Sequence, residues 1–411
     1  YKRQFMATSA LCVTGLSVRD TGSELSLFGQ AVILTLIQLG GIGIVTVTTF
    51  FTFHMGHSGL RNRLAATETL GADERMDLPR MLRWVLLVTL AFEAAGFLVL
   101  LTRNLTHQAP AQACWHALFH SISAYCNAGF ALQRDSFVGY QGDAVMNLAL
   151  AVLIVAGGLG FPVMLDLGGS LRKGPRGAWN RLHLHSKMML LGTAVLIPAG
   201  MLSLLILEAD GVLKEMSWPR SLLVTFFGSV TCRTAGFNTV EMSSLTNASL
   251  FVIILLMIIG AGPCSTGGGM KVSTFLVLVL RGWTNARGYS QVSMARRTIP
   301  QDIIERATTT ALLFGTIAVV AITTLLVVEQ SEVPHAQLKG VFLDMIFEAI
   351  SALGTVGLSL GITGDFSIPG RWILIVLMFV GRLGPISVAI ALSRRERKPK
   401  LEYPQSEPLI G

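Results

Sequence analysis

The sequence predicts an all-α polytopic membrane protein in which four pseudo-repeated helix–pore-loop–helix units surround one ion pore. Of its 411 residues, 52% are hydrophobic and 14% are charged, whereas soluble domains carry about 25% charged residues. Apolar runs long enough to cross a bilayer recur along the chain, and short glycine-centred segments recur between them. Five scattered cysteines without a CxxC pair argue against a disulfide framework or a zinc site. The composition therefore excludes a soluble enzyme, a disordered chain and a disulfide scaffold.

The apolar runs predict the individual helices. A bilayer core of roughly 30 Å requires about 20 apolar helical residues. Runs of that kind lie near 27–53, 81–102, 145–169, 187–207, 248–280, 306–328 and 371–393. Three shorter amphipathic stretches, 111–124, 219–230 and 338–352, are too short to span and are expected to be re-entrant.

The basic residues between the runs predict the orientation. The connections 54–80, 172–187, 281–306 and 394–400 carry 19 Lys and Arg, and the opposite connections carry seven. Basic loops face the cytoplasm, so we expect the re-entrant segments to open outward. In a membrane protein the net charge of +8 reflects this loop asymmetry, and we expect lipid but no nucleic acid as a partner.

Four short segments repeat the same pattern, each preceded by a serine (Ser9, Ser123, Ser229 and Ser351). The segments are Cys12-Val13-Thr14-Gly15, Cys126-Asn127-Ala128-Gly129, Arg233-Thr234-Ala235-Gly236 and Gly354-Thr355-Val356-Gly357. The predicted units are 1–60, 80–171, 186–282 and 303–393, followed by a cytoplasmic tail at 394–411. The first unit has no outer helix, and we expect a truncation there.

Irregular backbone at membrane depth is tolerated where it is buried or lines a watery cavity. Rings of backbone carbonyls can replace the hydration shell of potassium, and glycine permits the positive-φ conformations that aim successive carbonyls at one axis. A single small-residue triplet fits ordinary helix packing in lipid. Four copies in register favour a selectivity filter, so these sixteen residues are expected to bind K⁺ as the transported ion. Arg233 is expected to form a salt bridge behind the filter.

The run at 248–280 is interrupted by a glycine-rich stretch. It reads Gly260, Ala261, Gly262, Pro263, Cys264, Ser265, Thr266, Gly267, Gly268 and Gly269, and Lys271 follows it. Pro and several Gly break a helix. The interruption is either a kink packed by its neighbours or a flexible plug below the filter.

Arg382 lies near the middle of the last run. A charge at that depth costs about 2.5–3.5 kcal/mol on insertion scales, so this side chain should face the pore or a partner. A structural ion pair with Glu93 or Asp166 is the alternative to a pore-facing role.

Several longer motifs carry a resemblance to a known family. They are Ala10–Leu16, Thr231–Asn238, Ser265–Lys271, Gly381–Pro385 and Leu409–Gly411. With them the sequence resembles the Trk/Ktr/HKT superfamily of potassium transporters, and within it the membrane subunit of bacterial Ktr systems. The resemblance covers the whole chain. In that family a glycine at the first filter position accompanies potassium selectivity, which Gly15 satisfies.

The resemblance implies channel-like potassium uptake across a bacterial inner membrane, often sodium-stimulated, by a homodimer of pore-forming subunits. It also implies a cytosolic regulatory ring that binds nucleotide, no covalent cofactor, and Na⁺ as a possible activator. The 260–269 loop with Lys271 and Arg382 then corresponds to the gate of the family. Two alternatives stay open: a sodium-selective or ion-coupled symporter of the same superfamily, and an intramembrane serine protease built on Ser58 in a GxSG motif.

Overall fold

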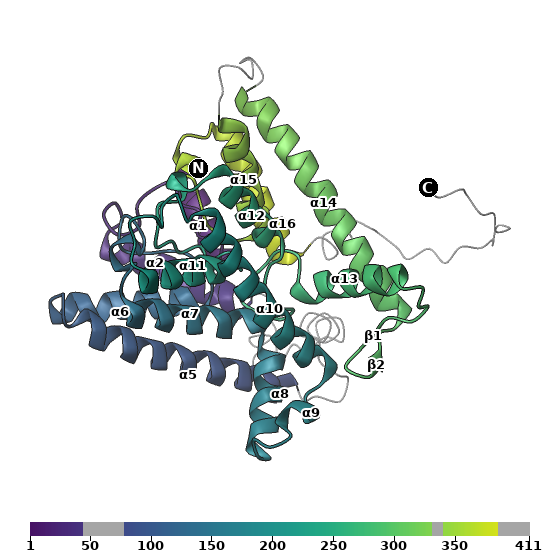
Figure 1. The fold of residues 1–411 in the computed structure, drawn as a ribbon. Helices are drawn as coiled ribbons and strands as arrows, with labels where there is room; N and C mark the ends of the chain where they lie inside the picture. The colour runs from purple at the N-terminus through teal and green to yellow at the C-terminus, as the bar shows by residue number, and fades with distance from the viewer. Residues whose placement is uncertain (44–77, 331–339, 385–411) are drawn as a thin grey trace.

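The computed structural model describes residues 1–43, 78–330 and 340–384 (Figure 1). The expected tail at 394–411 and the GxSG motif with Ser58 lie outside the described residues. Almost all regular structure in the described part is helical. The predicted all-α class is therefore confirmed.

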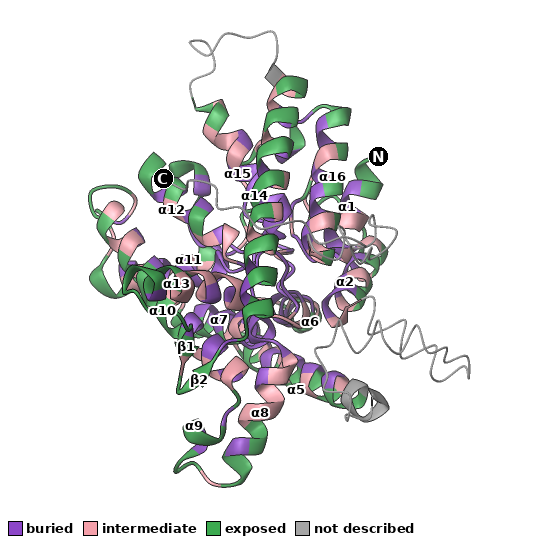
Figure 2. Ribbon diagram, turned by 90° about the vertical axis from the view of Figure 1, so that its right-hand side faces the viewer, coloured by how far each residue is buried: buried purple, intermediate pink, exposed green. Residues whose placement is uncertain are grey.

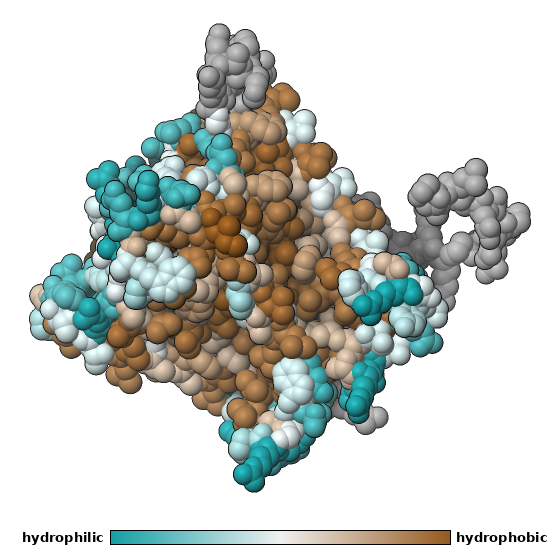
Figure 3. Space-filling model, viewed as in Figure 1, coloured by the Kyte–Doolittle hydropathy of each residue, from teal (hydrophilic) through white to brown (hydrophobic). Residues whose placement is uncertain are grey.

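Three long apolar helices lie on the outside of the molecule: α5 (Leu78–Asn104), α10 (Leu184–Leu207) and α14 (Gln301–Gln330). Within the described ranges, these three have the length and apolar composition of membrane spans. Most of their outward-facing residues are exposed, and the burial colours along α14 in Figure 2 show this for one of the three. The exposed surface between the hydrophilic ends is largely apolar (Figure 3). Such a surface suits contact with lipid rather than water.

Four shorter helices match the predicted half-spans and the start of the chain. They are α1 (Lys2–Leu11), α6 (Pro110–Tyr125), α11 (Trp218–Thr231) and α15 (Val341–Gly354). Each ends where one of the four glycine-centred segments begins. We call them the pore helices.

Four further helices follow the pore segments, and we call them the inner helices. They are α2 (Leu27–Ile42), α7 (Ala144–Leu159), α12 (Asn247–Ile258) and α16 (Ile368–Leu383). All four begin with the same local device, a side-chain oxygen that accepts a backbone N–H three residues on. The capping residues are Ser26, Asp143, Thr246 and Ser367.

The inner helices stop earlier than the apolar runs predict. The 145–169 run was expected to form one span, but α7 and α8 (Phe161–Arg172) are bent by 101°. Gly160 causes the bend, since its φ of 88° and ψ of 146° lie in a region that a side chain disfavours. The 248–280 run is interrupted as predicted, with α13 (Val272–Ala286) following α12 after the glycine-rich loop.

The helices close into a ring through contacts between neighbouring units. Each inner helix packs on the pore helix of the next unit: α2 on α6, α7 on α11, α12 on α15, and α16 on α1. The last contact joins the two ends of the described chain. This closure is compatible with four pseudo-repeats around one axis.

The remaining elements are short and lie at the two ends of the bundle. The 3₁₀ turns η1 (Val138–Tyr140), η2 (Met242–Ser244) and η4 (Ile362–Gly364) precede inner helices. The helix α9 (Ala178–Arg181) and the antiparallel pair β1 (Ser293–Met294) and β2 (Arg297–Thr298) belong to the basic connections.

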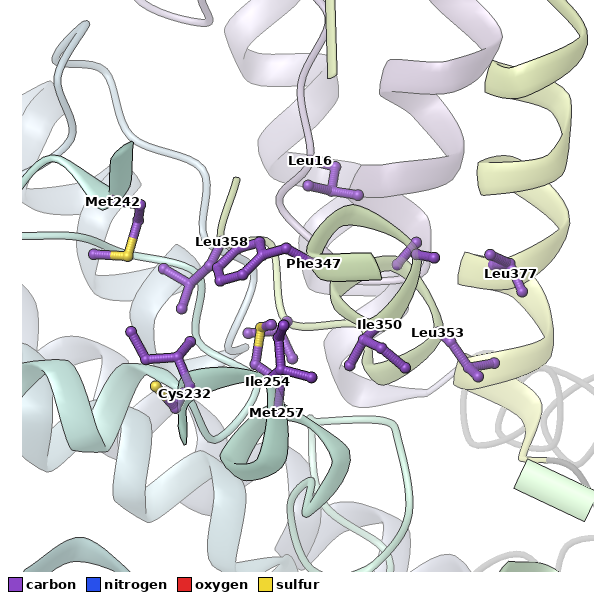
Figure 4. Packing of buried hydrophobic residues seen from close by; sticks show 14 of the residues in the cluster. Leu16, Cys232, Met242, Ile254, Met257, Phe347, Ile350, Leu353, Leu358 and Leu377 are labelled. Atoms are coloured by element: carbon purple, nitrogen blue, oxygen red, sulfur yellow. The ribbon is translucent and has the colours of Figure 1, made fainter. Parts of the chain in front are cut away.

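Apolar side chains hold the ring together around α15. Phe347, Ile350 and Leu353 of α15 lie in one hydrophobic cluster with Ile254 and Met257 of α12 (Figure 4). A buried pore helix needs such contacts because its position fixes the segment that follows it.

Candidate functional site: a fourfold ring beneath an outer vestibule

The four pore segments share one backbone conformation. In each, the residue two positions before the final glycine of the segment has a positive φ: Val13 (55°), Asn127 (58°), Thr234 (67°) and Thr355 (50°). The glycines have positive φ as well: Gly15 (100°), Gly129 (70°), Gly236 (77°) and Gly357 (93°). Positive φ is uncommon outside glycine. The recurrence at matching positions shows four equivalent loops.

The four glycines form a closed ring. A Cβ added at Gly15 would lie 3.0 Å from the Cα of Gly129 and 2.6 Å from the carbonyl oxygen of Ala128. A Cβ on Gly129 would lie 3.0 Å from the Cα of Gly236, and one on Gly236 would lie 3.2 Å from the Cα of Gly357. A Cβ on Gly357 would lie 3.0 Å from the Cα of Gly15, which closes the circle. The ring therefore has no room for a side chain at any of the four positions.

Hydroxyl groups of the pore helices hold the segments. The Ser9 Oγ accepts from the Gly15 N–H at 3.1 Å, and the Ser351 Oγ accepts from the Gly357 N–H at 3.1 Å. The Ser123 hydroxyl instead donates to the Phe130 carbonyl at 2.8 Å. Each of these three serines therefore forms a hydrogen bond with its own pore segment or with the residue directly after it.

The third serine departs from the predicted pattern. Ser229 donates to the Ile197 carbonyl of α10 at 2.7 Å, away from its pore segment. Thr231 takes over and donates to the Phe237 carbonyl at 2.6 Å. Ser229 lies seven residues before Gly236, whereas the other serines lie six residues before their glycines, and α11 runs to Thr231, so its C-cap Cys232 lies four residues before Gly236.

The ring forms the floor of a cavity of about 500 Å³ that is open to the surface. All four ring glycines line it, together with polar residues from the loops that follow the segments. Its charged lining residues are Asp20, Arg134, Asp135 and Glu241. We call this cavity the outer vestibule. Its net negative lining favours cations at the ring.

The glycine-rich loop lies directly on the other side of the ring. Its base is closed by a bridge between Ile259 and Met270. The Gly268 N–H donates to the Thr355 Oγ1 at 3.0 Å, and the Thr266 hydroxyl donates to the Tyr125 carbonyl at 3.2 Å. The loop therefore contacts the fourth pore segment and the end of pore helix α6.

Two cations border this loop. The Lys271 Nζ donates to the Gly267 carbonyl at 2.7 Å. The Arg382 guanidinium donates to the carbonyls of Thr266 and Gly40. Arg382 thus links α16 to both the loop and α2, so the two predicted gate elements lie together under the ring.

The carboxylates considered as partners of Arg382 have other contacts. Glu93 accepts from the Gln38 Nε2 at 3.2 Å, and Asp166 lies 2.9 Å from the His183 Nδ1. Backbone carbonyls, rather than either carboxylate, hold the guanidinium. The ion-pair alternative for Arg382 is therefore not what the structure shows.

Arg233 differs from expectation too. Its side chain is only 7% exposed, and among the described residues no carboxylate forms a salt bridge with it. Its Nε is buried without a hydrogen-bond partner in the same ranges. The expected salt bridge behind the filter is absent from this part of the chain.

The sequence reasoning missed a second set of glycines, on the inner helices. A Cβ on Gly40, Gly157 or Gly381 would lie 2.0, 1.9 or 2.0 Å from a carbonyl oxygen at the end of a pore helix. The carbonyls belong to Leu11, Tyr125 and Leu353. These glycines let the inner helices touch the pore segments, and their recurrence 24–28 residues after a ring glycine was the available signal.

Comparisons with known proteins fit this geometry. A model of the TrkH family, described as cation transport protein, matches residues 2–402. The Ktr system potassium uptake protein B of Vibrio alginolyticus is 37% identical over 99% of this chain and 87% of its own length. The potassium/sodium uptake protein NtpJ of Enterococcus hirae is 32% identical over 99% of this chain and 89% of its own.

A solved structure shows the same fold. The crystal structure of the potassium transporter TrkH from Vibrio parahaemolyticus has a TM-score of 0.74 at 21% identity, covering 95% of this chain and 77% of that one. Family model, relatives and fold agree, and the resemblance read from the motifs is confirmed. The chain belongs to the TrkH family of cation transport proteins, which are integral membrane transporters and not enzymes.

Proposed function

We propose that this protein carries potassium into a bacterial cell through the ring of four pore segments. The observation that carries the proposal is the closed circle of Gly15, Gly129, Gly236 and Gly357 beneath an acidic vestibule. Two relatives with potassium in their names support the choice of ion.

The mechanism follows from the backbone. Each segment has two positive φ values two residues apart, a backbone conformation that can turn successive carbonyl groups toward one axis. Carbonyl rings exchange with the hydration shell of an ion. The sixteen residues of the four segments thus act as a filter for dehydrated K⁺.

The loop with Arg382 and Lys271 is the gate in this proposal. A guanidinium and a potassium ion 4 Å apart repel by about 4 kcal/mol at an effective dielectric of 20. That repulsion slows permeation roughly a thousandfold. The glycine-rich loop has weak helix propensity. If this loop moves, Arg382 moves with it, because the guanidinium donates a hydrogen bond to the Thr266 carbonyl.

The proposal includes partners. We infer a homodimer controlled by a cytosolic ring that binds nucleotide, with sodium as a stimulating ion. The support is that the relative from Vibrio alginolyticus is named as a component of a Ktr system. Cysteine cross-linking from Ile410→Cys tests the dimer and the ring. If neither dimers nor adducts with a partner protein form, the inferred homodimer and regulatory ring are wrong.

A sodium-conducting or ion-coupled transporter is the second candidate. The observation in its favour is the relative named as a potassium/sodium uptake protein. By contrast, no family member or relative found supports a protease built on Ser58.

Flux in proteoliposomes decides between these functions. Full-length protein should take up rubidium down its gradient, potassium should compete with rubidium, and sodium should compete poorly. Uptake should not require a sodium or proton gradient. Equal competition by sodium, or uptake driven only by a second ion gradient, would overturn the proposed function.

A further inference from the structure

Glu348 of pore helix α15 is a fully buried carboxylate, with 0% of its side chain exposed. It accepts hydrogen bonds from the Thr363 Oγ1 at 3.0 Å, from the Leu360 N–H at 3.3 Å and from the Ser359 hydroxyl. All three donors belong to the loop that follows ring glycine Gly357. The carboxylate therefore ties this loop back to its own pore helix.

The tied loop forms part of the wall of the outer vestibule. Ser359, Leu360, Gly361 and Thr363 line the cavity. The Ser359 and Thr363 hydroxyl oxygens are also 2.9 Å apart, and the Gly361 N–H donates to the Ser359 Oγ at 2.9 Å. A buried acceptor with three donors fixes both the loop and the carbonyls that precede it.

The second unit has the same contact with a different side chain. His120 lies nine residues before Gly129, as Glu348 lies nine residues before Gly357. Its Nε2 accepts from the Leu132 N–H at 3.1 Å, and Leu132 and Leu360 each lie three residues after their ring glycine. A histidine that accepts at Nε2 is neutral, with its proton on Nδ1.

The first and third units lack this tie. The residues nine positions before Gly15 and Gly236 are Met6 and Phe227, which are buried and carry no oxygen or nitrogen in their side chains. Around the ring, the second and fourth units lie opposite each other. The hydrogen bonds of Glu348 and His120 to the following loops therefore occur only in the second and fourth of the described units, which gives the fourfold ring a twofold pattern.

We propose that Glu348 and His120 are positioning residues that set ion discrimination by fixing the outer loops of two opposite pore segments. The proposal rests on the proposed filter function and adds residues outside the sixteen of the filter. Neither side chain touches the ion. Each acts through a backbone N–H three residues beyond its ring glycine.

The chain itself supplies the test variants. Glu348→Met installs the residue of the first unit, and Glu348→Gln keeps an oxygen that accepts from Leu360 and Ser359. Asp344→Met is the matched control, because this half-buried carboxyl lies one turn earlier in α15. Rubidium uptake in proteoliposomes, with potassium and sodium as competitors, gives the ratio of potassium to sodium preference.

We expect Glu348→Met to lower this ratio roughly three- to tenfold, the range that the net contribution of one hydrogen bond gives. Glu348→Gln should restore most of the ratio, and Asp344→Met should leave it unchanged. His120→Phe should lower the ratio in the same direction. Folded Glu348→Met protein with the ratio of the unchanged protein would overturn the proposal.

A folding defect in Glu348→Met does not remove the test. Ser359→Ala combined with Thr363→Val deletes two of the same hydrogen bonds from the loop side, and an unchanged ratio in that folded variant would also overturn the proposal. If the unchanged protein does not prefer potassium, the proposed function fails instead. If it prefers potassium and only the Glu348 and His120 variants have no effect, this inference alone fails.

Discussion

At the scale of single residues, the four ring glycines set the geometry of the site, since a Cβ at any of them would lie within 3.2 Å of the Cα of the next glycine. Glycine at a fixed distance after each amphipathic half-span implied positive φ, and the four values from 70° to 100° confirm this conformation. The ties of Glu348 and His120 could not be predicted, because each depends on where a loop returns to its helix. Ser229 lies seven residues before Gly236, whereas the other three serines lie six residues before their glycines, and this one-residue difference accompanies the end of α11 at Thr231.

The first prediction concerns Gly15. In Gly15→Ser the new Cβ would lie 2.6 Å from the Ala128 carbonyl oxygen, and φ of +100° strains any side chain. We expect weaker discrimination of potassium from sodium, roughly tenfold or more. Competition by sodium for rubidium uptake measures it.

Gly139→Ser is the control for this change. Gly139 lies in the 3₁₀ turn η1, and nothing lies within 4 Å of a Cβ added at this position. Its ion preference should match the unchanged protein. If Gly15→Ser folds and keeps the same preference as well, the ring does not select the ion.

At the scale of elements, the sequence predicted the half-spans and the interrupted third inner helix. It did not predict the end of α7 at Gly160, because length and hydropathy alone treat the 145–169 run as one span, although Gly157, Gly158, Gly160 and Pro162 lie inside it. Periodicity reports which residues suit a helix but not where one glycine leaves helical φ and ψ. Contacts between units, such as Arg382 with Gly40, are likewise invisible to local patterns.

The second prediction concerns the gate formed by the loop and α16. Arg382→Ala removes the positive charge and the links to Thr266 and Gly40. We expect faster rubidium flux, up to the roughly thousandfold limit set by the repulsion, and less dependence on a regulatory partner. The measurement is flux per folded protein in proteoliposomes.

Arg382→Lys keeps the charge and is the matched control, so its flux should stay low. Ala at this position also copies Ala261, which follows Gly260 as Arg382 follows Gly381. Well-folded Arg382→Ala with flux no higher than the unchanged protein would refute the gate.

At the scale of the whole molecule, contacts between neighbouring units explain how four imperfect copies close into one ring. Each inner helix supports the pore helix of the next unit, so every segment is held from two sides. The sequence predicted the copies but not the order of their contacts, which the Cβ distances around the ring establish. The exposed apolar surface follows from the same arrangement, since one side of outer helices such as α14 faces away from the rest of the described residues (Figure 2).

The last prediction concerns the orientation of the whole molecule in the membrane. The basic connections hold 19 Lys and Arg against seven on the opposite side, so the vestibule should face outward. In a Cys114→Ser background, which removes an exposed thiol, Asp210→Cys should react with a membrane-impermeant maleimide in intact cells. Ser290→Cys, exposed beside the β1–β2 pair, should react only after permeabilisation. The reverse pattern would place the vestibule in the cytoplasm, and potassium would then meet the Arg382 side before the ring.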